Sequence, residues 1–347
     1  MIRVLVVDDS PTARALLVEI LRSDPEVQVI GEAKDGQEGV ELTGRLRPDL
    51  VTMDVKMPRL DGLAATKEIM IASPTPIVIV TASLNAHEVD LAMQSLRVGA
   101  LAVLRKPPGP DSPAFEEAAR KLLATVKAMA HVKVVRHWRQ AGPAPRSADP
   151  LPPPPRPGPR APLVAVATST GGPAALHRLL SRLPGDFPAP VLAVQHNAPG
   201  FMHGLVAWLG GGCDLTVKVA EQGEALRPGT VYLAPDDRHL GVAPAGTVLL
   251  SPAPPVGGFR PSGTFLFESA ARARGSSVVA LILTGMGDDG VEGLRAVRQA
   301  GGHIIAQDEA TSVVWGMPGA AVAAGLADSV LPLDAIPLRL AEMVIRG

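Results

Sequence analysis

A proline-rich stretch divides this sequence and limits how the chain can fold. Residues 141–162 contain ten prolines in 22 positions. Proline lacks a backbone N–H and fixes φ, so such a stretch cannot build a core and behaves as a semi-rigid spacer. A chain of 347 residues is long enough for two domains. We therefore expect domains at residues 1–125 and 163–347, joined by a connector helix and proline-rich linker over 126–162.

The connector begins with a helical pattern of apolar residues. Over residues 115–138 these residues recur at helical spacing, with lysine and arginine between them. This pattern predicts that the last helix of the first domain continues toward the linker, with a structural role rather than a separate binding role.

Composition excludes several classes of partner. The 33 basic and 34 acidic side chains leave a net charge of −1, and aromatic residues make up only 3% of the chain. A binding surface for nucleic acid or for anionic lipid is therefore not expected. The one cysteine, Cys213, excludes an intramolecular disulfide and favours a reducing compartment. No apolar run approaches the roughly 18 residues of a membrane span, so a cytoplasmic protein is expected.

The first domain alternates buried strands with amphipathic helices. Strands are predicted at residues 3–7, 27–33, 50–54, 77–81 and 100–104, and helices are predicted to begin near residues 11, 36, 62, 85 and 113. Five such units in about 125 residues predict an α/β fold with a doubly wound parallel sheet.

Polar side chains follow these strands. Asp8 and Asp9 follow the first strand, Asp54 ends the third, Thr81 ends the fourth and Lys106 follows the fifth. The carboxyl ends of parallel strands share one edge of the sheet, so these residues converge. Three carboxylates suit Mg²⁺, an oxygen-seeking cation. We expect Asp54 to accept a phosphoryl group whose oxygens are bound by Mg²⁺, Lys106 and Thr81.

This half resembles a two-component receiver domain. The resemblance rests on VVDDS at 6–10, MDVKMPRLDGL at 53–63, Thr81-Ala82 and Lys106-Pro107. It implies a flavodoxin-like strand order of 2-1-3-4-5, an Mg²⁺ requirement, and phosphorylation of Asp54 by a histidine kinase. Two positions depart from the family pattern: Lys56 stands where another polar residue is common, and Val103 replaces an aromatic switch residue.

The second domain opens with a buried strand that turns sharply into a helix. Residues 163–168 are apolar or β-branched, Ser169 lies in a glycine-rich turn, and Pro173 opens an alanine- and leucine-rich helix. Further strands are predicted at residues 191–195, 231–234, 278–283 and 303–307. The second half is therefore predicted to be another doubly wound, Rossmann-like α/β domain.

A serine, a histidine and an acid follow strands of this domain. Ser169 follows the first strand, His196 the second, and the loop with Asp288 and Asp289 a later one. Together they provide a nucleophile, its base and the acid that orients the base. Singly, Ser169 can be a helix cap, His196 a structural histidine, and either aspartate a turn residue.

The second half resembles the catalytic domain of chemotaxis protein-glutamate methylesterases. The matching motifs are STGGPAAL at 169–176, VQHNAPGF at 194–201, VYLAPDDRHL at 231–240, LTGMGDDGVEGL at 283–294 and QDEATSVVWGMPGAA at 307–321. The resemblance implies Ser169 as nucleophile, His196 as base and Asp289 as orienting acid. It also implies that Thr170 and Met286 line the site, with backbone N–H groups near them forming the oxyanion hole.

The same resemblance implies the reaction and the partners. The substrates are glutamyl γ-methyl esters of chemoreceptors, with deamidation of receptor glutamine as a second activity and no cofactor for the esterase step. The chain would contact a chemosensory histidine kinase and methylated receptors, and would reach the membrane only through those receptors. Departures are Ala167-Thr168 in place of Gly-Ala, Asn197 in place of methionine, and Gly263-Thr264 in place of Val-Asp.

Three alternatives remain at this point. The chain could be a methylesterase of a chemosensory pathway that does not control flagella. It could be a phosphorylation-dependent docking protein without enzymatic activity, although Ser169, His196 and Asp289 argue against this. A DNA-binding response regulator is disfavoured, because the second half lacks a basic recognition helix.

Overall fold

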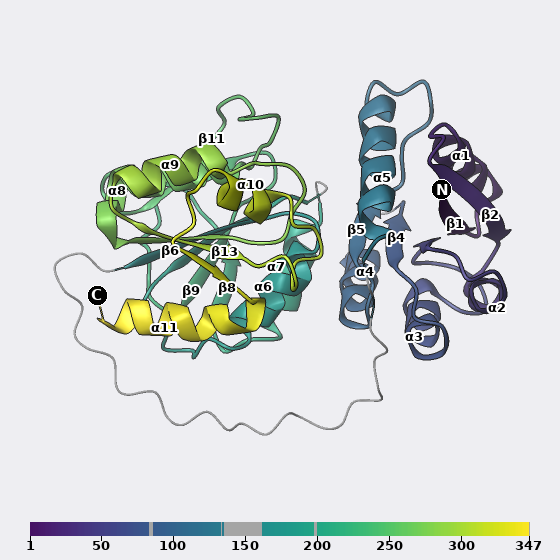
Figure 1. Ribbon diagram of the computed structural model, residues 1–347, viewed down its shortest axis with the longest axis horizontal. Coiled ribbons are helices and arrows are strands. Elements are labelled where there is room, and N and C mark those ends of the chain that lie inside the picture. Colours follow the sequence, from purple (N-terminus) through teal and green to yellow (C-terminus); the bar gives the residue numbers. More distant parts are fainter. Residues whose placement is uncertain (83–85, 133, 135–161, 198–199, 347) are drawn as a thin grey trace. The chain divides into compact units, whose positions relative to one another are not determined.

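The computed structural model describes residues 1–82, 86–132, 134, 162–197 and 200–346 (Figure 1). The chain divides into two units, Met1–Ala148 and Asp149–Gly347. The predicted proline-rich linker lies outside the described residues except for Pro162.

The first unit is a parallel sheet with helices on both faces. Its elements are β1 (Ile2–Val7), α1 (Pro11–Arg22), β2 (Val27–Ala33), α2 (Gly36–Leu46), β3 (Leu50–Met53), α3 (Gly62–Ala72), β4 (Ile77–Thr81), α4 (Ala86–Arg97), β5 (Ala102–Arg105) and α5 (Phe115–Met129). The strand order β2-β1-β3-β4-β5 confirms the flavodoxin-like prediction. Helices α1 and α5 contact each other, as do α2, α3 and α4 in turn, so the two groups cover opposite faces (Figure 1).

Local sequence explains where the first three helices begin. Ser10, Asp35 and Asp61 are N-caps whose side chains accept hydrogen bonds from backbone N–H groups of the first turn. These bonds satisfy donors that a helix leaves unpaired at its N-terminus. The central strands β3 and β4 are buried along their whole length, as expected for parallel strands covered on both faces.

The helix predicted over residues 115–138 is shorter than expected. Helix α5 ends at Met129, and the N–H of the C-cap Ala130 donates to Val126 O. The valines at 132, 134 and 135 give a physical reason, because β-branched residues lose rotamer freedom in a helix. The rest of the predicted helix, at 133 and 135–138, lies outside the described residues.

The second unit contains a larger parallel sheet. Its elements are β6 (Leu163–Thr168), α6 (Gly172–Leu180), β7 (Val191–Gln195), α7 (Met202–Gly210), β8 (Thr216–Val219), β9 (Thr230–Leu233), β10 (His239–Val242), β11 (Val248–Ser251), α8 (Gly263–Arg274), β12 (Val278–Ile282), α9 (Val291–Gln299), β13 (His303–Gln307), α10 (Met317–Ala323), β14 (Ser329–Leu331) and α11 (Ile336–Arg346), with 3₁₀ turns at Gly275–Ser277 and Leu333–Ala335. The strand order is β14-β13-β12-β6-β7-β9-β8, with all pairs parallel.

The sheet of the second unit is also covered on two faces. Helices α8, α9 and α10 form one layer, and α6, α7 and α11 form the other (Figure 1). Strands β10 and β11 form a separate antiparallel pair. The fold confirms two parallel-sheet α/β units, whereas β8, β10, β11 and β14 were not predicted. These four strands have only three or four residues each.

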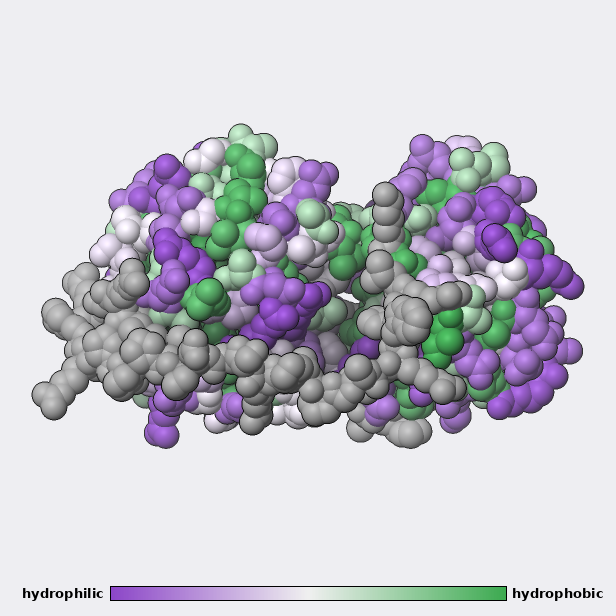
Figure 2. Space-filling model, turned by 60° about the horizontal axis from the view of Figure 1, so that its bottom comes forward, coloured by the Kyte–Doolittle hydropathy of each residue, from purple (hydrophilic) through white to green (hydrophobic). Residues whose placement is uncertain are grey.

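Strands β6, β7 and β12 lie at the centre of this sheet and carry the loops that matter for chemistry. Their apolar residues are fully buried, which holds the carboxyl ends of the three strands rigidly together. On the face drawn in Figure 2, hydrophilic residues are interleaved with smaller hydrophobic areas. Among the described residues, no helix has the length and apolar character needed to cross a membrane.

Candidate active site

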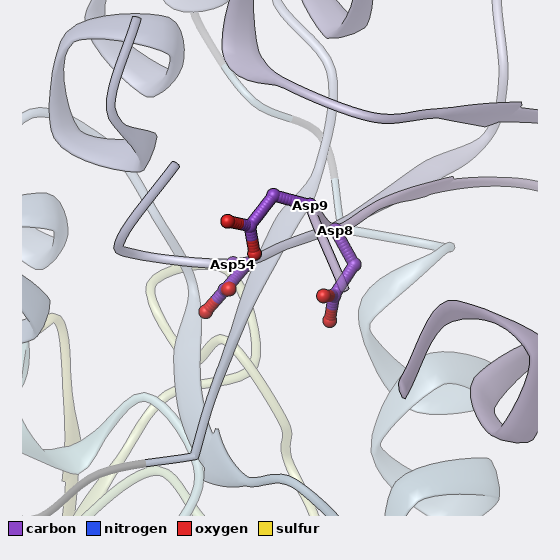
Figure 3. A group of neighbouring side chains, drawn as sticks. All are labelled: Asp8, Asp9 and Asp54. Carbon is purple, nitrogen blue, oxygen red and sulfur yellow. The ribbon is translucent and has the colours of Figure 1, made fainter. Parts of the chain in front are cut away.

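The acidic cluster of the first unit forms as predicted at the carboxyl ends of β1 and β3. Carboxylate oxygens of Asp8, Asp9 and Asp54 lie within 4.8 Å of one another (Figure 3). Lys106 Nζ lies 2.7 Å from Asp8 Oδ2 and 2.9 Å from Asp54 Oδ2. One lysine therefore balances only part of the charge of three carboxylates. An oxygen-only donor set with excess negative charge fits Mg²⁺.

Asp54 ionises less readily than an ordinary aspartate. Its side chain is buried, and this burial raises its pKa to about 6, against the opposing effect of Lys106. The neighbouring Asp8 carboxylate raises this pKa further. Burial disfavours the charged form of Lys106, but its ion pairs with Asp8 and Asp54 raise the lysine pKa overall. The Val55 N–H donates to Asp54 Oδ1 at 2.8 Å.

The other predicted residues of this unit lie around the cluster. Thr81 is buried at the end of β4, and its carbonyl accepts the N–H of Lys106, the residue after β5, at 2.8 Å. Lys56 is exposed two positions after Asp54, and Val103 is half-buried in β5.

In the second unit, Ser169 lies in a tightly bonded turn after β6. Its N–H donates to Thr284 O at 3.0 Å, and its carbonyl accepts the Gly172 N–H at 2.9 Å. Thr168 Oγ1 also donates to Thr284 O, at 2.9 Å. The departure at Thr168 therefore adds a side-chain bond between the end of β6 and the loop that follows β12. Gly171, at φ 78°, takes the left-handed conformation that glycine adopts without strain.

The predicted base and acid are in direct contact. His196 Nε2 lies 2.9 Å from Asp289 Oδ2. Because an ionised carboxylate only accepts hydrogen bonds, Nε2 carries the proton and Nδ1 has the free lone pair. Nδ1 is buried and, among the described residues, has no hydrogen-bond partner. The tautomer that can accept a proton at Nδ1 is therefore fixed by Asp289.

Asp289 is surrounded by donors at the N-terminus of α8. Ser262 Oγ donates to Oδ1 at 2.7 Å, the Gly263 N–H to Oδ2 at 2.6 Å, and the Thr264 N–H to Oδ1 at 3.2 Å. Burial works to raise the pKa of Asp289, but His196, Ser262 and Gly263 outweigh it and lower this pKa to about 2. The carboxylate is a permanent negative charge at neutral pH.

Gln195 was missed by the sequence analysis. It is buried at the end of β7, and its Nε2 donates to Ser169 O at 2.9 Å and to His196 O at 3.0 Å. It ties the turn that holds Ser169 to the loop that begins with His196. A polar residue at the end of an otherwise apolar strand was the available signal. Ser262 was also missed, because its bond to Asp289 links residues 27 positions apart.

The predicted lining residues also lie at these loops. The Thr170 carbonyl accepts Thr284 Oγ1 at 2.9 Å. Met286 is half-buried and follows Gly285, where an added Cβ would lie 2.9 Å from Ser169 Cβ. His196 Nδ1 has no hydrogen-bond partner within the described part of the chain, so Ser169 Oγ does not bond to it in this structure. Such contacts commonly tighten only when substrate binds.

Comparisons with known proteins match both units. The CheB methylesterase family matches residues 164–340, and the response regulator receiver domain matches residues 4–136. The chain is 58% identical over 348 residues to the Myxococcus xanthus protein named protein-glutamate methylesterase/protein-glutamine glutaminase 4, covering 98% of this chain and 96% of the relative. A protein of the same name, numbered 3, from Anaeromyxobacter dehalogenans is 57% identical over 342 residues, with 98% of each chain covered.

A solved structure agrees with the second unit. The crystal structure of the Thermotoga maritima CheB methylesterase catalytic domain is 44% identical, with a TM-score of 0.51, and covers 53% of this chain and 98% of that domain. Family matches to both units and full-length relatives lead to one assignment. The chain belongs to the CheB methylesterase family, with a response regulator receiver domain in its first unit.

Proposed function

We propose that this protein is a phosphorylation-activated serine esterase that hydrolyses glutamyl γ-methyl esters on chemoreceptors. The observation that carries the proposal is the fixed pair of His196 and Asp289 next to the turn that holds Ser169. The names of the relatives support the substrate and add glutamine deamidation as a second activity.

In the proposed reaction, His196 Nδ1 takes the proton of Ser169 Oγ as this oxygen attacks the ester carbonyl. Backbone N–H groups near Thr170 and Met286 stabilise the oxyanion. The imidazolium then returns the proton to the methoxy oxygen, methanol leaves, and an acyl-serine remains. Water then loses a proton to the same nitrogen as it attacks the acyl-serine. The imidazolium returns this proton to Ser169 Oγ as the acyl bond breaks, and the receptor is left with a glutamate side chain. Asp289 stays ionised throughout, and with glutamine the leaving group is ammonia.

The receiver supplies control. Asp54 is the proposed phosphoryl acceptor for a chemosensory histidine kinase. Asp8, Asp9 and Asp54 would hold Mg²⁺, which neutralises phosphoryl oxygens when bound. Lys106 and Thr81 would contact the remaining oxygens. We place the protein in the cytoplasm, at the membrane only through receptors, because its one cysteine fits a reducing compartment.

The test is methanol release from methylated receptor membranes, with and without a small-molecule phosphodonor and Mg²⁺. Wild type should release methanol, and the phosphodonor should stimulate this release. Ser169→Ala should abolish release, whereas Asp54→Asn should keep the basal rate and lose the stimulation. If Ser169→Ala retains release, the assignment of Ser169 as nucleophile is wrong. If wild type releases no methanol, the esterase proposal fails and a phosphorylation-dependent docking role replaces it.

A further inference from the structure

One face of the His196 imidazole is covered by the aromatic ring of Phe259, which has no role in the reaction proposed above. The ring of Phe259 lies parallel to it, with ring centroids 4.3 Å apart and an interplanar angle of 6°. The His196 side chain is only 8% exposed. The imidazole is therefore held in its own plane by Asp289 and on its face by Phe259.

A tight hairpin turn presents Phe259. The N–H of Val256 donates to Phe259 O and the N–H of Phe259 donates to Val256 O, both at 3.0 Å. The two residues between them, Gly257 and Gly258, have φ values of 59° and 86°. A two-residue turn with both φ values positive is the type I′ geometry that glycine pairs adopt most easily. The glycine pair thus fixes the shape of the turn that carries Phe259.

Arg260, the residue after Phe259, anchors the turn to neighbouring loops. Arg260 Nε donates to Asp237 Oδ1 at 2.8 Å, and Arg260 Nη1 donates to the carbonyls of Pro252 and Ala253 at 3.2 and 3.1 Å. The neighbouring Asp236 accepts the Gly200 N–H at 2.7 Å, on the loop that follows His196. In the β9–β10 loop, Asp236 therefore holds the segment that follows His196, and Asp237 holds the segment that carries Phe259.

We propose that Phe259 is a positioning residue for His196, acting on both its orientation and its protonation. The inference rests on the proposed role of His196 as base. A single in-plane hydrogen bond to Asp289 resists rotation of the imidazole but leaves it free to tilt, and a parallel ring prevents tilting. The face of an aromatic ring also carries partial negative charge and attracts a cation. Phe259 therefore stabilises the imidazolium that forms when Nδ1 takes the serine proton.

The test compares the full-length variants Phe259→Leu and Phe259→Tyr in methanol release as a function of pH. Leucine keeps the apolar cover and removes the ring face, so kcat should fall about three- to tenfold with KM little changed. The acid limb of the pH profile should move down by about half a pH unit, because the imidazolium loses its partner. Phe259→Tyr keeps the ring face and should restore both values.

A second stacked pair in the same unit provides the matched control. Phe265 lies against His239, with centroids 4.7 Å apart and an interplanar angle of 18°. Phe265→Leu should leave the acid limb of the pH profile in place. An equal shift in Phe265→Leu, or an unchanged profile and kcat in Phe259→Leu, would overturn the inference.

A measurement without substrate separates this inference from the proposed function. The 1Hε1–13Cε1 signal of His196, assigned from the His196→Gln variant, should move downfield in Phe259→Leu at one fixed pH, because the ring current of the stacked Phe259 is lost. An unchanged His196 signal overturns the inference whatever the enzyme does. If wild type releases no methanol while the His196 signal still moves in Phe259→Leu, the proposed esterase function is overturned instead.

Discussion

Asp54 in the first unit and Asp289 in the second are each only 6% exposed, and each lies after a strand of a parallel sheet. Their surroundings nevertheless shift their pKa values in opposite directions. Asp54 has one backbone donor, shares Lys106 with Asp8, and has its pKa raised to about 6. Asp289 accepts from Ser262, Gly263, Thr264 and His196, and its pKa is lowered to about 2.

The comparison shows that burial alone does not decide how a carboxylate ionises. Burial raises the pKa of both aspartates, and the number of donors around each determines the net direction. Asp54 is left with too little positive charge, which suits its proposed role in binding a cation and accepting a phosphoryl group. Asp289 has a donor for each of its oxygens, which suits its proposed role as a fixed charge that orients His196.

The largest expected effect comes from removing the charge of Asp289. Asp289→Asn should lower kcat for methanol release by about 10⁴-fold, because an amide no longer fixes the tautomer with Nδ1 unprotonated. The exposed neighbour Asp288 provides the control, and Asp288→Asn should stay within about twofold of wild type. Equal losses in the two variants would contradict the assignment of Asp289.

Removing the charge of Asp54 should stabilise the first unit. The folded pKa of about 6 lies above the ordinary value of 3.8, so ionisation of Asp54 destabilises the fold progressively as pH rises through this window. Asp54→Asn should therefore raise the free energy of unfolding at pH 8 by up to about 3 kcal/mol, and by less at pH 5. Hydrogen exchange of β1 and β3 peptides in the full chain measures this; a gain independent of pH would contradict the charge argument.

Acid should weaken the second unit through Asp289. Its folded pKa of about 2 lies below 3.8, so the stabilisation it provides is present above pH 4 and is lost as pH falls toward 2. The loss should be about 2 kcal/mol in wild type. Hydrogen exchange of β6 and β12 peptides between pH 4.5 and 2.5 reports it, after correction for the intrinsic rate. The same loss in Asp289→Asn would assign the effect to other carboxylates.

The smallest expected effect tests how the Asp289 environment is packed. A Cβ added at Gly263 would lie 2.6 Å from Ala167 Cβ and 3.3 Å from Asp289 Oδ2. Gly263→Ala should destabilise the second unit by about 1–2 kcal/mol through overpacking. Adding Ala167→Gly should recover part of this loss, because it removes the opposing methyl group. Strictly additive effects would show that the two departures from the family pattern are independent.

The sequence predicted the parts of the molecule that depend on local pattern and on strand ends. Alternating strands and helices predicted both sheets, and the ends of predicted strands placed Asp54 and His196 at the carboxyl edges of those sheets. Asp289, in contrast, was chosen over Asp288 by resemblance, because both lie in the same loop. The structure distinguishes them: Asp289 is buried against His196, whereas Asp288 is exposed.

The supporting contacts could not be predicted in the same way. Hydrogen bonds join Gln195 to Ser169 and Ser262 to Asp289, and Phe259 stacks on His196. The partners in each pair are distant in sequence, so these contacts leave no periodic signal. The stacking of Phe259 depends on a turn whose glycines are visible in the sequence, but whose direction is set by Arg260 and its partners. Tertiary contacts, not local preference, decide such positions.

The central claim is that the pKa values of two buried aspartates in one chain are shifted in opposite directions. The most direct test is a titration of 13Cγ-labelled aspartate in the full chain, with signals assigned from Asp54→Asn and Asp289→Asn. We expect the Asp54 signal to titrate near pH 6 without Mg²⁺ and at lower pH with it, and the Asp289 signal to remain that of a carboxylate at pH 3. Titration of both signals near pH 4, or in the reverse order, would contradict the account.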